Sequence, residues 1–150
     1  MSSNSNSQVL AQIGKDGFTT KITAGSHSFN ADEPISVGGK DLGPSPYDLL
    51  LSALGACTAM TLRMYSDRKK WEIDEITVHL IHNKEYDKDC EDCESSKAKI
   101  DKISRTIEIV GNLDSEKKER LLLIANKCPV HKTLHNTIKV ETKITENKTN

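Results

Sequence analysis

One stretch, from Gly43 to Trp71, constrains the fold of this chain more than any other, because it predicts a single long helix. Its start carries a full set of N-terminal helix signals. Ser45 can cap the helix, Pro46 suits the first helical position, and Asp48 stands where a capping-box acid returns to the Ser45 amide. We therefore expect a well-defined N-terminus for this helix.

The middle of this helix is apolar on almost every side. From Leu49 to Tyr65 few polar side chains interrupt the apolar run, and a helix of this kind needs burial on several sides. The run is shorter than the roughly 18–20 residues of a membrane span, and Arg63 divides it, which favours a soluble core helix. A chain of 150 residues offers few elements to surround such a helix, so we expect a second copy of the chain to cover it.

Cys57 lies in the middle of the helix, on a stripe that we expect to point into the core. The stripe comprises Leu50, Ala53, Leu54, Thr61 and Met64. The helix alone leaves two interpretations of this cysteine open. A buried free cysteine is most often a small inert hydrophobe, because burial raises the pKa of its thiol. A reactive thiol needs a further activating feature.

The composition bounds the class of protein. The length suits one domain spanning residues 1–150, with residues 1–8 and 146–150 as frayed ends. The 21 basic and 22 acidic residues nearly cancel and are scattered, which argues against a nucleic-acid or membrane partner. The first residues lack the basic and apolar regions of a secretory signal. We therefore expect a cytoplasmic protein whose four cysteines are thiols, metal ligands or a redox pair.

Hydrophobic patterns divide the rest of the chain into short strands and two further helices. The expected strands are Val9–Ile13, Phe18–Ala24, His27–Asn30, Ile73–Glu85, Lys102–Val110 and Thr137–Thr145, and the expected helices are Ser115–Lys127 and Val130–Asn136. The first three strands predict an antiparallel meander, and the next two a long hairpin with a charged connector. This order predicts an α+β fold with an antiparallel sheet and its helices on one face.

Cys128 sits at the junction between the last two helices, where Pro129 ends one helix and can start the next. The cysteine then becomes the N-cap of the short helix, where free backbone amides favour a thiolate. His131 follows three residues later and can reach back toward the sulfur. The alternative is that Cys128 only caps the helix and that His131 is solvated.

Cys90 and Cys93 have the spacing of half a zinc site, and Cys128 with His131 could form the other half. The long separation of the two halves argues against a compact zinc finger. Acidic neighbours also oppose thiolate formation, so a dithiol redox motif is a weak alternative. A solvated acidic loop is the simplest interpretation of this segment.

The long helix and the Cys128 segment together resemble a known family. The sequences GPSPYDLLLSALGACTAMTLRMYSDRK and KCPVHKTLHNTIKVET are similar to those of the OsmC/Ohr family of osmotically induced and organic hydroperoxide resistance proteins. The resemblance covers the chain from Asp32 to Ile144, and with the DCEDC segment it is strongest to an OsmC-like subgroup. It implies an OsmC-like fold and an intertwined homodimer, in which sheets from both chains wrap two central helices and the active sites lie at the interface.

The resemblance also implies thiol-dependent peroxidase chemistry in oxidative stress defence, without a cofactor. Cys57 is then the peroxidatic cysteine and Cys128 the resolving one, and an external dithiol reduces their disulfide. The substrate is an organic hydroperoxide, and its alkyl tail enters an apolar pocket. The pocket is formed by Leu50, Leu54, Met60 and Met64. The alternative is a non-catalytic protein of the same fold that binds an apolar small molecule at the dimer interface.

The chain departs from the founding members of the family at the polar clamp that holds the reactive thiol. In those members an arginine from the N-terminal strands and a glutamate at the start of the central helix form this clamp. No arginine precedes Cys57 here, so Lys15 or Lys21 would replace it, although lysine lacks the bidentate fork of arginine. The glutamate position aligns with Tyr47, and Asp48 is offset by one residue, or about 100° around the helix. The resemblance therefore implies an altered clamp.

Overall fold

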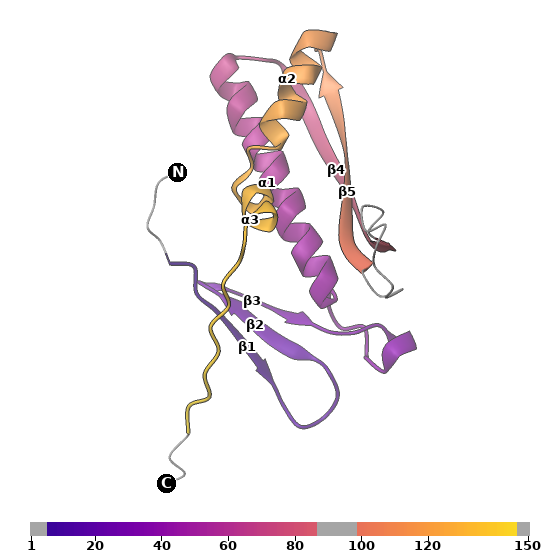
Figure 1. Ribbon diagram of the computed structural model, residues 1–150, viewed down its shortest axis with the longest axis vertical. Coiled ribbons are helices and arrows are strands. Elements are labelled where there is room, and N and C mark those ends of the chain that lie inside the picture. Colours follow the sequence, from indigo (N-terminus) through magenta and orange to yellow (C-terminus); the bar gives the residue numbers. More distant parts are fainter. Residues whose placement is uncertain (1–5, 87–98, 147–150) are drawn as a thin grey trace, which may run out of the picture. The chain divides into compact units, whose positions relative to one another are not determined.

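The computed structural model describes residues 6–86 and 99–146, and it confirms the α+β class (Figure 1). Its elements are β1 (Val9–Ile13), β2 (Thr20–Ala24), β3 (His27–Ala31), the short 3-10 helix η1 (Ile35–Val37), α1 (Pro46–Lys69), β4 (Ile73–Tyr86), β5 (Lys99–Gly111), α2 (Ser115–Ala125) and α3 (Pro129–His135). No helix in the described ranges is long and apolar enough to cross a membrane.

The chain divides into two compact units. The first comprises Met1–Ala53 and Leu80–Ser104, and the second comprises Leu54–His79 and Arg105–Asn150. Helix α1 and both strands of the β4–β5 sheet contribute to each unit. The expectation of a single domain over residues 1–150 stays a prediction.

The first unit contains the N-terminal meander, which the sequence predicted. The sheet order is β1–β2–β3 with antiparallel pairing, and Leu10 lies opposite Thr23 while Ile22 lies opposite Phe29. The second strand begins two residues later than expected, at Thr20. The side chains of β1 are all exposed in this chain, so the sheet has a face that the described part of the unit does not cover.

Two of the three glycines in the loop between β3 and α1 lie where the backbone folds closely on itself. A Cβ atom at Gly43 would lie 1.9 Å from the carbonyl oxygen of Asn30, and one at Gly39 would lie 1.8 Å from that of Glu33. The same loop surrounds the buried carboxylate of Asp32, which accepts hydrogen bonds from the Thr19 hydroxyl at 2.8 Å and the Glu33 amide at 2.8 Å. Burial raises the pKa of Asp32, but these hydrogen bonds outweigh it and the net pKa is lowered.

Helix α1 begins with the capping box that the sequence predicted. The Ser45 amide donates to Asp48 Oδ2 at 3.0 Å, and the Asp48 amide donates to Ser45 Oγ at 3.3 Å. At the other end Lys70 adopts a left-handed conformation with φ 56°, and the Trp71 amide donates to the Ser66 carbonyl at 2.9 Å. This is the Schellman pattern of a helix C-terminus, with lysine where glycine is usual.

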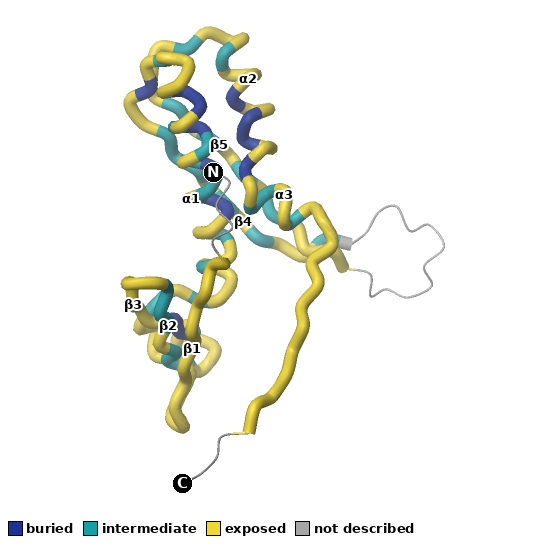
Figure 2. Tube along the Cα trace, turned by 90° about the vertical axis from the view of Figure 1, so that its left-hand side faces the viewer, coloured by how far each residue is buried: buried dark blue, intermediate teal, exposed yellow. Residues whose placement is uncertain are grey.

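The core of the second unit forms where α1 and α2 cover one face of the β4–β5 sheet (Figure 1). Figure 2 shows that the buried residues gather in these two helices. The buried cluster comprises Leu62, Tyr65, Ile73, Leu121, Ile124 and Ala125. The hairpin of β4 and β5 and the helices on one sheet face therefore follow the sequence prediction within this unit.

The stripe of α1 that is buried differs from the predicted one. We expected the stripe of Cys57 to face the core, but Leu50 and Met64 are exposed, by 37% and 55%, and Cys57 is only half-buried. The buried stripe is rotated to one side of it, through Leu54, Thr58, Leu62 and Tyr65. Thr58 can occupy the core because its hydroxyl donates to the Leu54 carbonyl at 2.7 Å. The expectation that this helix is buried on several sides included a second copy of the chain, and it stays a prediction.

The C-terminal helices agree with the prediction within two residues. The Asp114 carboxylate caps α2 by accepting from the Lys117 amide at 2.8 Å. Helix α2 ends at Ala125 rather than Lys127, because the Lys127 amide donates to the Ile124 carbonyl in a tighter turn. Cys128 is the N-cap of α3, as predicted, and Pro129 is its first residue.

The predicted strand Thr137–Thr145 is wrong. Residues 137–146, all within the described part of the chain, form neither helix nor strand. Their alternating apolar side chains point to solvent, with Ile138, Val140 and Ile144 exposed by 56%, 80% and 95% (Figure 2). Alternation predicts an extended segment, but a strand also needs a neighbouring strand to pair with, and the described residues of this chain supply none here.

Candidate active site

The second unit brings Cys57 and Cys128 together. Cys57 lies on α1 and Cys128 caps α3, and the two side chains are close enough for each thiol to shift the pKa of the other. Both are free thiols in this structure. Cys57 is half-buried, whereas Cys128 is fully buried with 0% exposure. A small molecule that approaches this pair therefore reaches Cys57 first.

The surroundings of Cys128 favour its thiolate. Burial raises the pKa of this thiol, but hydrogen bonds outweigh the burial, and the net pKa is lowered below its usual value of 9.0. The groups that lower it are the Cys57 side chain, the backbone of α3 at His131 and Val130, and the Thr58 side chain. The junction that the sequence singled out is therefore an environment that stabilises a negatively charged sulfur.

The surroundings of Cys57 have the opposite effect. Burial raises the pKa of the Cys57 thiol, and its hydrogen bond to Cys128 raises it further. The Val130 amide and the Thr61 hydroxyl lower it, but the net pKa lies above 9.0. The pKa values of the two thiols therefore move in opposite directions, and Cys128 is the more acidic of the pair.

Arg105 contacts the neighbours of both cysteines, Thr58 and His131. Its role at this site was not predicted from the sequence. Its guanidinium donates to Thr58 Oγ1 at 2.9 Å, to Asn126 Oδ1 at 2.9 Å and to the Ala125 carbonyl at 3.4 Å. The alternation of β5 could have identified this arginine, because Arg105 lies on the same half-buried face of the strand as Ile107 and Ile109. An arginine on the covered face of a strand needs buried acceptors.

His131 contributes to the site differently from the prediction. We expected its ring to reach back to the sulfur, but ring Nδ1 pairs instead with the Arg105 guanidinium at 3.2 Å. Burial lowers the pKa of His131, and the charges of His135 and Arg105 lower it further. The two imidazoles stack with centroids 4.1 Å apart. His131 is therefore held neutral beside the thiols.

The residues that the sequence suggested for the polar clamp belong to the first unit. Lys15 and Lys21 are exposed, and Asp48 takes part in the capping box. The Tyr47 ring stacks on the His82 imidazole with centroids 4.4 Å apart. A supporting role of these four residues toward the thiols stays a prediction.

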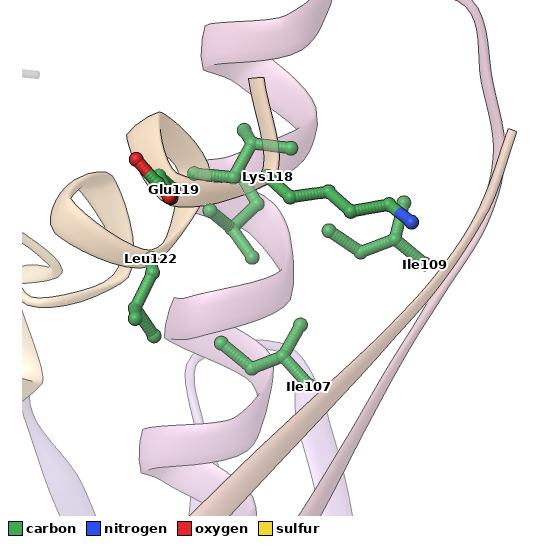
Figure 3. Close-up of a pocket in the computed structure, with 7 residues that line it drawn as sticks. Ile107, Ile109, Lys118, Glu119 and Leu122 are labelled. Atoms are coloured by element: carbon green, nitrogen blue, oxygen red, sulfur yellow. The ribbon is translucent and has the colours of Figure 1, made fainter. Parts of the chain in front are cut away.

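The predicted pocket residues are divided between core and surface. Leu54 is buried, whereas Leu50, Met60 and Met64 are exposed. A cavity of about 390 Å³ lies instead between α2, α1 and β5 of the second unit, where apolar side chains line it and the Lys118 side chain extends across it toward Ile109 (Figure 3). Its lining comprises Leu62, Ile107, Ile109, Lys118, Glu119, Leu121 and Leu122. A pocket formed by the four predicted residues stays a prediction.

The predicted zinc half-site, Cys90 and Cys93, lies outside the described residues. Within residues 6–86 and 99–146 no group of three or more histidine, cysteine or acidic side chains could hold a metal ion. The weak zinc alternative for Cys90 and Cys93 therefore stays a prediction.

Comparisons with known proteins identify the fold. A family model described as OsmC-like protein matches residues 38–143. An OsmC-like protein from Mycoplasma pneumoniae has a TM-score of 0.68 at 20% identity, with 89% of each chain covered. An OsmC-like protein of unknown function from Vibrio cholerae has a TM-score of 0.70 at 9% identity, with 86% of this chain and 93% of the other covered.

An organic hydroperoxide resistance protein from Elizabethkingia anophelis, solved with thiocyanate bound, has a TM-score of 0.66 at 18% identity, with 93% of this chain and 94% of the other covered. No curated protein matches the chain. Structural likeness at these identities shows the fold alone.

Proposed function

Since the chain belongs to the OsmC-like protein family, we propose that it is a thiol-dependent peroxidase that reduces organic hydroperoxides in the cytoplasm, in defence against oxidative stress. The observation that carries the proposal is the pair of neighbouring free thiols, one half-buried on α1 and the other fully buried at the N-cap of α3. The fold shared with an organic hydroperoxide resistance protein supports the substrate class. Cys57 is the peroxidatic cysteine, because it is the more exposed of the two, and Cys128 is the resolving one.

The resting pair supplies the proton transfers of the first half of the cycle. The Cys57 thiol passes its proton along the hydrogen bond to the Cys128 thiolate, which leaves Cys57 as the nucleophile. The Cys57 thiolate attacks the terminal oxygen of the hydroperoxide, so that an S–O bond forms and the O–O bond breaks. The alkoxide that leaves takes the proton from Cys128 and departs as the alcohol. Cys57 is now a sulfenic acid, and Cys128 is a thiolate again.

The second half of the cycle joins the two sulfur atoms. The Cys128 thiolate attacks the Cys57 sulfur, an S–S bond forms, and hydroxide leaves and takes a proton from solvent to become water. One hydroperoxide has then been reduced to alcohol and water, and two thiols have been oxidised to a disulfide. An external dithiol reduces this disulfide and restores the resting pair.

Peptide mapping after a stoichiometric dose of cumene hydroperoxide tests this cycle. In a Cys90→Ser/Cys93→Ser background we expect a single Cys57–Cys128 disulfide, and in the same background with Cys128→Ser we expect a Cys57 sulfenic acid that dimedone traps. The matched Cys57→Ser variant should neither consume hydroperoxide nor form a disulfide. Full consumption by Cys57→Ser, or an unoxidised wild-type protein, would overturn the proposal.

We further propose that the protein is a homodimer and that the site lies at its interface. Helix α1 leaves Met60 and Met64 exposed by 64% and 55%, and α2 leaves Leu122 exposed by 61%. Residues 137–146 add an extended segment with exposed alternating apolar side chains. Exposed apolar surface of this extent on two helices and a terminal segment is typical of a chain that associates with another copy.

A second candidate function is favoured by the cavity in the second unit. Its volume of about 390 Å³ and its mainly apolar lining suit a small apolar ligand, with Lys118 able to pair with an acidic group at its edge. The protein would then bind such a molecule without redox chemistry. Binding of a fluorescent fatty acid that Leu122→Glu abolishes, together with unreactive thiols in the peptide map above, would favour this function over the peroxidase.

A further inference from the structure

We propose that Arg105 is a positioning residue for the thiol pair: its guanidinium ties both sides of the Cys128 turn to α1 and holds His131 in one neutral tautomer. The role that it gives Cys128 in catalysis rests on the proposed peroxidase cycle. The contacts of Arg105 themselves do not depend on that cycle, and they can be tested on the reduced protein.

The guanidinium connects three elements of the second unit. An arginine side chain carries five N–H donors in a rigid plane and no acceptor. Here one terminal nitrogen donates to Thr58 of α1 and to the Ala125 carbonyl at the end of α2. The other donates to Asn126, in the turn after α2, and pairs with His131 of α3. Cys128 lies between Asn126 and His131, so Arg105 holds the turn on both sides of the thiol.

The contact with His131 determines where the imidazole carries its proton. A guanidinium can only donate, so Nδ1 of His131 must be the acceptor of the 3.2 Å contact. The proton of the neutral ring is therefore on Nε2. A doubly protonated imidazole would direct an N–H at the guanidinium and lose the contact. Arg105 thus fixes the position of His131 on α3, three residues after Cys128.

The contact with Thr58 acts on the same sulfur from the side of α1. Thr58 Oγ1 accepts from Arg105 at 2.9 Å and donates its single proton to the Leu54 carbonyl at 2.7 Å, so its orientation is fixed. The side chain of this fully buried threonine also lowers the pKa of Cys128. Arg105 therefore acts on Cys128 through two other residues, Thr58 and His131, and not by direct contact with substrate.

Two substitutions of Arg105 and one matched control distinguish the effect of its hydrogen-bonding geometry from the effect of its charge. Arg105→Met removes both the charge and the donors, and Arg105→Lys keeps the charge but loses the planar fork. Arg120→Met is the control, because Arg120 also lies in the second unit and donates to the Tyr65 hydroxyl at 3.0 Å without contacting the turn. All variants are made in the full chain with Cys90→Ser/Cys93→Ser, and all are studied reduced and without hydroperoxide.

Two measurements report the predicted effects. Ultraviolet thiolate absorbance as a function of pH gives the thiolate fraction of Cys128, and isotope-edited NMR of the imidazole nitrogens gives the His131 tautomer. Near neutral pH we expect the Cys128 thiolate fraction to fall about tenfold in Arg105→Met, which corresponds to about one pKa unit. Arg105→Lys should give an intermediate fall, and Arg120→Met should give none. The fixed Nε2–H tautomer of His131 should be lost in both Arg105 variants and kept in the control.

The outcomes distinguish this inference from the proposed function. An unchanged thiolate fraction and tautomer in Arg105→Met would overturn the positioning role, whatever the peroxidase activity. If Arg105→Met does not fold, the same two measurements on Arg105→Lys decide the question, because the lysine keeps a cation in the same place. An unchanged thiolate fraction and tautomer in Arg105→Lys would then overturn the positioning role. A wild-type protein that consumes no hydroperoxide, but whose thiolate fraction depends on Arg105, would overturn the peroxidase proposal alone.

Discussion

At the scale of single residues, the structure separates two cysteines that have the same intrinsic chemistry. Both are removed from water, and burial alone raises the pKa of each. The difference lies in the other groups around each sulfur. Cys57, Thr58 and the start of α3 lower the pKa of Cys128, whereas Cys128 raises the pKa of Cys57. The less exposed thiol is therefore the one that ionises first.

Removing the Cys57 thiol should raise the pKa of Cys128. In Cys57→Ala the Cys128 thiol loses a neighbouring group that lowers its pKa, so a higher pH is needed to form the thiolate. Thiolate absorbance of the reduced Cys90→Ser/Cys93→Ser protein measures this titration. Cys57→Ser keeps a hydroxyl donor and should shift the midpoint less. A Cys128 midpoint that is the same in the alanine variant as in the parent would contradict the assignment of donor and acceptor.

At the scale of elements, the start of α1 is stabilised by local hydrogen bonds, and Ser45→Ala should show this. We expect a loss of about 1 kcal/mol in the free energy of unfolding near neutral pH, because the Asp48 amide loses its acceptor and the Asp48 carboxylate loses a donor. Urea denaturation followed by circular dichroism measures it. Ser52→Ala, at an exposed position of the same helix, is the control and should be neutral or slightly stabilising.

The effect of Ser45→Ala should also depend on pH. The hydrogen bond from the Ser45 side chain lowers the pKa of Asp48 below 3.8 in the folded chain. A carboxylate with a depressed pKa stabilises the folded state above the unfolded pKa, and this stability is lost as the pH falls through the folded pKa. The difference between the two proteins should therefore shrink in acid below 3.8. A difference that stays constant into this range would show that Asp48 takes no part.

The core of the second unit depends on the buried face of α2, and two adjacent leucines can test this. Leu121 is 1% exposed and Leu122 is 61% exposed. Leu121→Ala should lower the free energy of unfolding by about 2–5 kcal/mol, because it leaves a cavity in the cluster with Leu62. Leu122→Ala should lower it much less. Equal losses measured by urea denaturation would mean that α2 is rotated from the orientation described here.

At the scale of the whole molecule, exposed apolar side chains on α1 and α2 are the basis of the proposed dimer. Met60→Glu/Met64→Glu should produce a monomer, because charges on the exposed face of α1 cannot be buried against a second copy. Sedimentation velocity at micromolar concentration measures the change. Asp74→Lys, an exposed charge change on β4, is the control and should leave the dimer intact. A wild-type protein that sediments as a monomer would contradict the dimer and the interfacial site.

Much of the secondary structure could be predicted because its determinants lie within a few residues. The capping box at Ser45 and Asp48 marks the start of α1, and the Asp114 cap marks that of α2. Pro129 separates α2 from α3 and leaves Cys128 as the N-cap. Both candidate cysteines could also be identified from the sequence. Local context singled out Cys128, and the family resemblance singled out Cys57. Helix caps and helix boundaries can be predicted in this way because they depend on the backbone preferences of a few neighbouring residues.

What only the tertiary structure decided depends on residues far apart in the chain. A helical wheel cannot tell that Thr58, rather than Cys57, faces the core, because the choice depends on an arginine 47 residues away that hydrogen-bonds the threonine. A second long-range contact pairs Arg105 with His131, 26 residues further along the chain. The alternating apolar residues of 137–146 favour an extended backbone. A β-strand, however, also needs a second strand to pair with, and the segment itself cannot supply one. Local sequence therefore determined the elements, and packing between distant segments decided the buried faces and the ionisation of the site.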